Sequence, residues 1–128
     1  MIILQIKRKW FDMIVSGEKR EEYRDIKPYY STRFSNWFGI LVKKTGEVIR
    51  PCYGRQPVEF RNGYKRDSPS FVAMCSIRIG IGKQEWGAEK GKKYFILTIH
   101  EIQTPNKGKK KYERIKKYEE MEEKNDGK

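Results

Sequence analysis

The stretch Ser70-Phe71-Val72-Ala73-Met74-Cys75-Ser76-Ile77-Arg78-Ile79-Gly80-Ile81 decides the fold, because it has the clearest alternation in the chain. Its apolar side chains fall on every second residue, at Phe71, Ala73, Cys75, Ile77, Ile79 and Ile81. Successive side chains of a strand point to opposite faces, so the pattern predicts a long strand with this face in the core. Gly80 and Gly82 lie where a barrel strand would bend or bulge.

Further strands are predicted on both sides of this stretch. Residues 94–102 form a second strongly apolar strand, after a loop over 83–93 that carries Glu85-Trp86-Gly87. Residues 58–61 alternate over a shorter span and end at Asn62-Gly63, a favoured turn pair. A β-branched run over residues 2–6 predicts a buried strand at the start of the chain.

Two helices are predicted in the first forty residues. Apolar side chains recur at helical spacing over 10–15, and Gly17 falls where a left-handed residue would end the helix. Pro28 can open a second helix, because proline is tolerated in a first turn. Its apolar stripe would be Tyr30, Phe34, Trp37 and Phe38. Aromatic residues at this spacing are more typical of a core than of a base-stacking surface.

The order of these elements predicts an α+β domain whose core is an antiparallel, closed, barrel-like sheet, with one or two short helices near its start. The domain is expected to span residues 1–104. Beyond it, residues 105–128 are dominated by Lys, Glu and Tyr and predict a basic tail that is helical or disordered.

Charge indicates the class of partner. The chain has 29 Lys and Arg against 17 Asp and Glu, a formal net charge of +12. Such a surface attracts nucleic acid or an anionic membrane without choosing between them. No apolar run is long enough to span a bilayer or to resemble a signal peptide, so we expect a cytoplasmic protein with no membrane partner.

The chain gives no reason to expect a metal or another cofactor. Cys52 and Cys75 form no CxxC pair, and the single histidine, His100, is distant from both in sequence. His100 falls inside the predicted last strand, where a hydrogen-bonded strand residue is the simplest interpretation.

The polar stretch Gly17-Glu18-Lys19-Arg20-Glu21-Glu22-Tyr23-Arg24 carries the functional signal, as G-x-K-x-x-E-x-R. Its pattern alone leaves strand and helix open. Gly17 lets the chain reverse and brings Lys19 to the mouth between helix and strand. On a strand, Glu22 and Arg24 share a face about 7 Å apart, so their side chains can meet.

Together these groups suit a nucleotide, because a carboxylate accepts from the amino edge of a base and the cations contact phosphate or carbonyl oxygen. An ordinary surface salt bridge is the alternative, and it would do little.

The G-x-K-x-x-E-x-R pattern after a strand and the helix Trp10–Ser16 resembles the signature of the ASCH domain family, and the Glu85-Trp86-Gly87 loop before an apolar strand resembles its end. The resemblance implies a PUA-like barrel and RNA as partner. One branch of the family deacetylates acetylcytidine with a lysine, a threonine nucleophile and a glutamate, and another is described as a metal-dependent ribonuclease. Lys19 matches that lysine, while Glu22 stands where the threonine would be.

We therefore expect an RNA-binding module that receives a base or nucleotide in a basic cleft. The expected nucleic-acid-binding residues are Lys19, Glu22, Arg24, Lys7, Arg8, Lys9, Arg50, Arg55 and Arg78. The alternative is a small hydrolase acting on RNA or a modified nucleoside, with Lys19 and Glu22 as catalytic residues. An adaptor for anionic membranes or acidic proteins is a third hypothesis that rests on charge alone.

Overall fold

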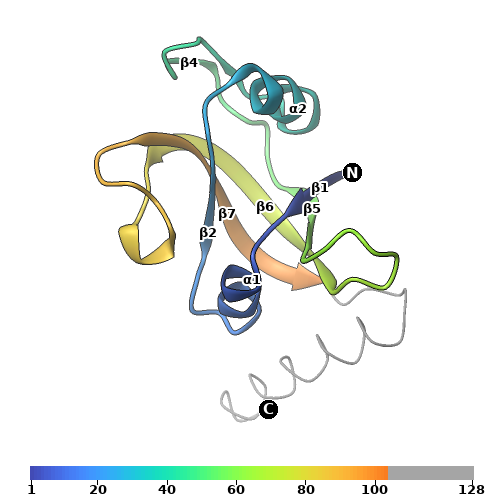
Figure 1. Cartoon of the computed structure of the whole chain (residues 1–128). Helices are drawn as coiled ribbons and strands as arrows, with labels where there is room; N and C mark the ends of the chain where they lie inside the picture. The colour runs from blue at the N-terminus through green and yellow to red at the C-terminus, as the bar shows by residue number, and fades with distance from the viewer. Residues whose placement is uncertain (104–128) are drawn as a thin grey trace.

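The computed structural model describes residues 1–103 and shows an α+β domain built on a curled, half-barrel sheet (Figure 1). The strands are β1 (Ile2–Gln5), β2 (Glu21–Arg24), β3 (Leu41–Val42), β4 (Val48–Arg50), β5 (Gln56–Arg61), β6 (Ser70–Ile81) and β7 (Lys93–Gln103). The helices are α1 (Arg8–Val15), α2 (Pro28–Phe38) and the short 3-10 helix η1 (Gln84–Trp86). The predicted tail over 105–128 and the end of the predicted domain at residue 104 lie outside the described residues.

Five strands form the main sheet in the order β1-β5-β6-β7-β2. Three of the four pairings are antiparallel, whereas β1 runs parallel to β5 with Ile2 opposite Val58. The expectation of a wholly antiparallel sheet is therefore wrong at this pair. The chain between β1 and β5 contains α1, β2, α2, β3 and β4. This segment provides the long crossover that a parallel pair requires.

The prediction of a closed sheet also differs from the structure. The sheet curls like part of a barrel, but β1 and β2 remain its two edges and do not pair with each other. The gap between these edges is the feature that positions the candidate site.

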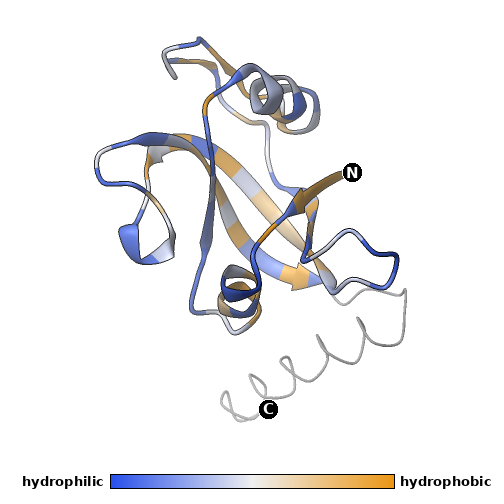
Figure 2. Cartoon of the chain, viewed as in Figure 1, coloured by the Kyte–Doolittle hydropathy of each residue, from blue (hydrophilic) through white to orange (hydrophobic). Residues whose placement is uncertain are grey.

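The inner face of the sheet packs against both helices to form the main core. Phe11 and Ile14 of α1 and Phe34 and Phe38 of α2 meet the sheet there, and all four are buried. The alternation along β6 and β7 is visible as changing hydropathy along these strands (Figure 2). From β6, this core takes Phe71, Ala73, Cys75 and Ile77. The predicted inward face is thus confirmed for these four residues, whereas Ile81 is exposed where β6 extends past the core.

The aromatic stripe of α2 is part of this core. Phe34 and Phe38 are fully buried, and Tyr30 and Trp37 pack against the cluster. The Phe34 ring stacks on Tyr30 and meets Phe95 edge-on. The core interpretation of this stripe is therefore confirmed.

A smaller cluster covers the outer face of the sheet. It contains Tyr23, Tyr94, Ile96 and Ala88, with Trp86 packed against it. These residues bring the 82–92 loop down onto β2 and β7. Gly82 permits this contact, because a Cβ at that position would lie 2.7 Å from both Ala88 and the Tyr23 ring.

A short hairpin precedes β5. Strand β4 pairs antiparallel with β3, and Arg50 belongs to β4. This hairpin lies beside α2, at the end of the molecule opposite α1 (Figure 1). No helix within residues 1–103 is long and apolar enough to cross a membrane.

Candidate functional site

Arg24 bridges the two edges of the sheet. From β2, its Nη2 donates to the main-chain oxygen of Gln5 in β1 over 2.8 Å, and its Nη1 donates to the oxygen of Tyr23 over 2.9 Å. Edge strands present unpaired carbonyls that need a partner or a cover. The Arg24 guanidinium is a hydrogen-bond partner for β1 and also covers its edge. A side chain, rather than strand pairing, therefore connects β1 to β2.

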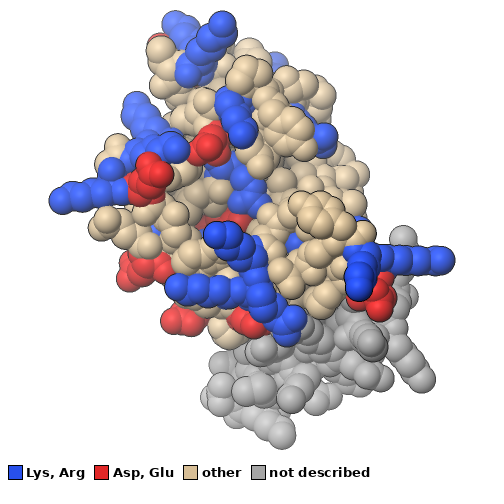
Figure 3. Space-filling view, viewed as in Figure 1, with Lys and Arg blue, Asp and Glu red and all other residues tan. Residues whose placement is uncertain are grey.

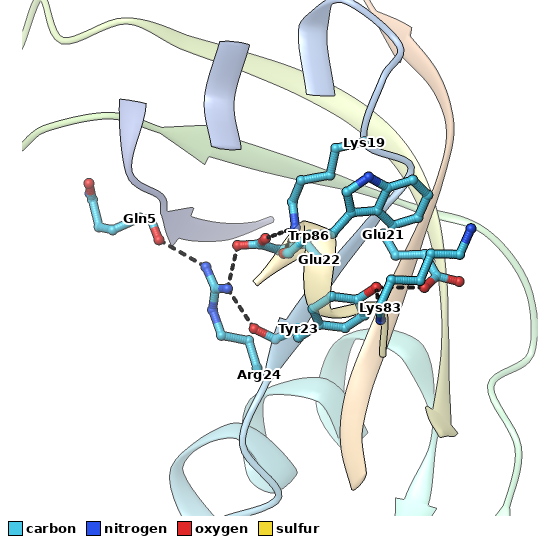
Figure 4. A network of polar contacts seen from close by, with 8 residues as sticks. All are labelled: Gln5, Lys19, Glu21, Glu22, Tyr23, Arg24, Lys83 and Trp86. Atoms are coloured by element: carbon cyan, nitrogen blue, oxygen red, sulfur yellow. Dashed lines mark hydrogen bonds and ion pairs between the residues drawn. The ribbon is translucent and has the colours of Figure 1, made fainter. Parts of the chain in front are cut away.

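Glu22 lies beside this guanidinium on the core face of β2. In the register with β7, Glu22 is opposite Leu97 and Arg24 is opposite Phe95, both of which belong to the core. One carboxylate oxygen of Glu22 is 2.5 Å from Arg24 Nη1, and the other is 3.1 Å from Lys19 Nζ. The carboxylate is therefore held between two cations (Figure 4). The expectation that these three side chains meet is confirmed.

The sequence placed Lys19 at the mouth between helix and strand, but its side chain is fully buried behind the carboxylate and does not line the hollow. Its ammonium donates to the main-chain oxygen of Trp86 over 2.6 Å and lies 4.7 Å from the Trp10 ring and 5.0 Å from the Tyr23 ring. Burial lowers the pKa of Lys19, and the nearby Glu22 carboxylate opposes that shift. Lys19 thus ties the 82–92 loop to the floor of the site (Figure 4).

Tyr23 fixes the same loop from the outer face. Its hydroxyl donates to a Glu21 carboxylate oxygen over 2.8 Å and accepts from the backbone N–H of Lys83 over 2.9 Å. Burial raises the pKa of Tyr23, so the phenol stays neutral and able to donate. Lys19, just before β2, and Tyr23, within it, therefore both anchor the loop that carries Trp86.

A hollow of about 240 Å³ opens between the two sheet edges. It is lined by Gln5, Ile6, Lys7, Trp10, Glu22, Tyr23, Arg24, Trp86, Gly87 and Tyr94. The space-filling view shows basic and acidic atoms at the bottom of a depression in this face, with Lys and Arg side chains projecting around it (Figure 3). Pockets for drug-sized ligands run from roughly 300 to 1,000 Å³. This hollow is smaller, so it suits a single ring system.

The polar groups at the floor can both donate and accept. Arg24 has five N–H groups, of which three donate to partners within residues 1–103, so two remain. Each carboxylate oxygen of Glu22 accepts from one cation and keeps a second lone pair. The Glu22–Arg24 pair therefore keeps both donors and acceptors, in a hollow that Trp10 and Trp86 also line.

The predicted binding residues separate into two groups. Lys7, Glu22 and Arg24 line the hollow, Lys19 lies buried behind it, and Lys9 lies over Trp10 at 4.7 Å. The others lie elsewhere: Arg8 pairs with Asp12, Arg78 pairs with Glu21 on the outer face, Arg50 donates to the oxygen of Gly39, and Arg55 is exposed before β5. These four do not line the hollow.

Sequence reasoning missed the aromatic walls. The sequence places Trp10 in the apolar stripe of a helix and Trp86 in a loop 67 residues beyond Lys19. The glycine next to Trp86 was the available signal in the sequence. In the structure Gly87 adopts a φ of 101°, and a Cβ at this position would lie 3.0 Å from the Trp10 ring. That close approach brings the two indoles to one hollow.

Two other expectations concern chemistry outside the hollow. His100 is a hydrogen-bonded strand residue as expected, with its Nε2 2.7 Å from the hydroxyl of Ser76. Among residues 1–103, no three His, Cys, Asp or Glu side chains are grouped as metal ligands.

No protein-family model, curated protein or solved structure matches this chain.

Proposed function

We propose that this chain is a cytoplasmic RNA-binding protein of the ASCH type, with a PUA-like barrel, and that one base of a single strand enters the hollow between β1 and β2. One observation carries the proposal: the Glu22–Arg24 ion pair lies at the floor of a hollow walled by Trp10 and Trp86. That combination offers hydrogen bonds to the edge of a base and aromatic contact to its faces.

The floor complements any base edge that presents a donor beside an acceptor. Glu22 accepts from an amino or imino group, and Arg24 donates to a ring nitrogen or carbonyl oxygen. The indoles of Trp10 and Trp86 contribute through stacking, which is worth about 1–3 kcal/mol per base and tolerates every base. With a volume of about 240 Å³, the hollow is of a size for one base.

The charges at the mouth suit the backbone of that strand. Lys7 lines the hollow and Lys9 lies over Trp10, so both are beside the path that the phosphates would take. Lys19 is sealed beneath the floor, where its charge and hydrogen bonds position Glu22 and Trp86. In this arrangement Lys19 is a positioning residue.

Trp86→Ala tests the proposal, because it removes one wall and keeps the main-chain oxygen that Lys19 needs. Fluorescence anisotropy with a ten-nucleotide single-stranded RNA should show affinity about tenfold weaker than that of the unaltered protein. The matched control is Tyr53→Ala, which removes an exposed aromatic side chain beside Gly39, at the far end of the molecule, and should bind normally. Equal affinities for Trp86→Ala and the unaltered protein would reject the hollow as the binding site.

The same assay checks the electrostatic part. The logarithm of the association constant should fall linearly with the logarithm of salt concentration, with a slope near −0.7 for each phosphate contacted. A flat response would exclude a bound phosphate backbone.

A small hydrolase is the second candidate, favoured by one observation. Lys19 is a buried lysine whose pKa is lowered and whose ammonium touches a carboxylate, and shifted groups of this kind gather at active sites. Purified protein should then convert acetylcytidine or a mixed RNA pool, and Lys19→Met and Glu22→Gln should abolish turnover. Absence of product from both substrates would reject the hydrolase.

A further inference from the structure

We propose that the loop over residues 62–68, between β5 and β6, is a second contact site for the same RNA strand, with the ring of Tyr64 stacking on a base outside the hollow. The inference rests on the proposed RNA binding. Tyr64 is 87% exposed, the highest value among the exposed large apolar residues of the described part, and Lys65 and Arg66 follow it. A lone exposed tyrosine is ordinary on a protein surface. Tyr64 differs from such a residue because its loop is bonded directly to the wall of the hollow.

Gln5 links this loop directly to the hollow. Its main-chain oxygen accepts from Arg24, and its side-chain oxygen accepts from the N–H of Gly63 over 3.2 Å. Two more bonds join the same segments, from the side chain of Asn62 to the oxygen of Ile6 and from the N–H of Ile6 to the oxygen of Arg61, each over 2.9 Å. The root of the loop is therefore attached to the wall of the hollow, one residue from Tyr64.

The loop is also held in shape from within. Ser68 is buried, accepts from the N–H of Lys65 at its hydroxyl over 2.9 Å and donates its own N–H to the oxygen of Lys65 over 3.0 Å. The N–H of Asn62 donates to the oxygen of Pro69 over 2.9 Å, which closes the base of the loop. Because the turn is preformed, a ligand that meets Tyr64 does not have to order the backbone around it.

The side chains of the loop fit a nucleic acid better than another partner of the same charge. Lys65 and Arg66 can contact phosphates, and Lys7, which lines the hollow, adds a third cation. The aromatic ring provides a stacking surface that any base can use, a pairing typical of single-strand binding proteins. A strand bound at both sites would contact Lys7 as well as the Tyr64 ring.

The test compares two ligands that differ in length. A ribonucleoside 5′-monophosphate fills the hollow alone, whereas a ten-nucleotide single strand reaches both sites. Tyr64→Ala should weaken binding of the ten-nucleotide strand about tenfold and leave the affinity for the monophosphate unaltered. Trp86→Ala should weaken both ligands, and Tyr53→Ala should weaken neither. The double variant Lys65→Ala/Arg66→Ala should reduce the salt slope of the longer strand by about 0.7 for each phosphate that it no longer neutralises.

The outcomes separate the two proposals. If Trp86→Ala loses affinity while Tyr64→Ala binds the longer strand normally, the loop is not a contact site and the hollow stands. If Tyr64→Ala weakens both ligands equally, its effect comes through the fold of the hollow and the second site is rejected. If the unaltered protein binds neither ligand, the proposed function fails and this inference fails with it.

Discussion

Strands β2 and β5 each carry a glutamate and an arginine two residues apart, with one aromatic residue between them. In β2 the sequence is Glu22-Tyr23-Arg24, and in β5 it is Glu59-Phe60-Arg61. In both strands the arginine contacts the glutamate, at 2.5 Å in β2 and at 2.6 Å in β5. Nearly identical tripeptides therefore build the same ion pair on the same sheet.

The two pairs differ in the face that they occupy. Phe60 is fully buried in the main core, so Glu59 and Arg61 point away from it. Tyr23 packs in the smaller outer cluster, where its hydroxyl is satisfied by Glu21 and Lys83, so its two charged neighbours point to the core face.

Burial follows from that choice of face. The side chains of Glu22 and Arg24 are 6% and 13% exposed, against 16% and 25% for Glu59 and Arg61. Glu22 also has Lys19 as a second, fully buried cation. The central residue of the tripeptide thus decides whether the pair is a partly buried contact on the outer face or the floor of a hollow.

The largest expected effect comes from removing each carboxylate in turn. Glu22→Gln leaves the buried ammonium of Lys19 without its counter-charge and should lower the free energy of unfolding by about 3 kcal/mol. Glu59→Gln breaks a more exposed pair and should cost less than about 1 kcal/mol. Urea denaturation of both variants measures the difference.

Replacing either partner of the Lys19–Glu22 pair by an apolar residue sharpens the same comparison. Glu22→Leu should also be strongly destabilising, because the uncompensated charge of Lys19 remains, whereas Lys19→Met with Glu22 intact should cost less because Arg24 still neutralises the carboxylate. If Glu22→Gln and Glu59→Gln lowered the free energy of unfolding equally, water would reach both ion pairs to the same extent. That result would contradict the difference in burial between the two faces.

A smaller effect is expected from pH, because the inner face of the sheet should exclude water at Cys75 as well. Burial raises the pKa of this thiol from 9.0 to about 12. The unfolded chain therefore loses the proton first, so the contribution of the thiol is complete below pH 9 and is lost as pH rises toward 12. By pH 10 the loss should be on the order of 1 kcal/mol.

The control for that effect is the other cysteine. Cys75→Ala should flatten the decline between pH 9 and 10 relative to the unaltered protein, whereas Cys52→Ala, at a half-buried site outside the sheet, should retain it. Comparing variants at the same pH cancels the separate contributions of Lys19 and Tyr23. An identical decline in Cys75→Ala would contradict a dry inner face at this position.

Much of the fold could be predicted because it depends on local patterns. The alternation from Phe71 to Ile77 placed the central strand, and the spacing of Phe34 and Phe38 placed the second helix in the core. The parallel pairing of β1 with β5 could not be predicted from the strands themselves, because a short β-branched run carries no signal of its direction relative to a distant partner.

The candidate site could be predicted only in part. Glu22 and Arg24 are two residues apart on a strand, so their contact could be predicted. The turn at Gly17 likewise predicted that Lys19 lies near them. Which face they occupy depends on whether Tyr23 or its neighbours enter the core, and a four-residue strand of mostly polar side chains does not determine that. The Lys19–Trp86 contact spans 67 residues and depends on how the 82–92 loop folds back over Tyr23.

The smallest expected effect is the response of each ion pair to salt. Interactions between exposed charges are screened over about 10 Å at 0.1 M salt and about 3 Å at 1 M, while buried pairs are screened much less. Urea denaturation at several salt concentrations measures the loss of unfolding free energy caused by Glu59→Gln. This loss should shrink toward zero as salt rises from about 0.05 to about 1 M, because screening strengthens over that range. The cost of Glu22→Gln should stay nearly constant over the same range. If salt reduced both costs to the same degree, water would reach Glu22 as readily as Glu59, and the proposed hydrogen bonds between the floor and a base would have to compete with that water.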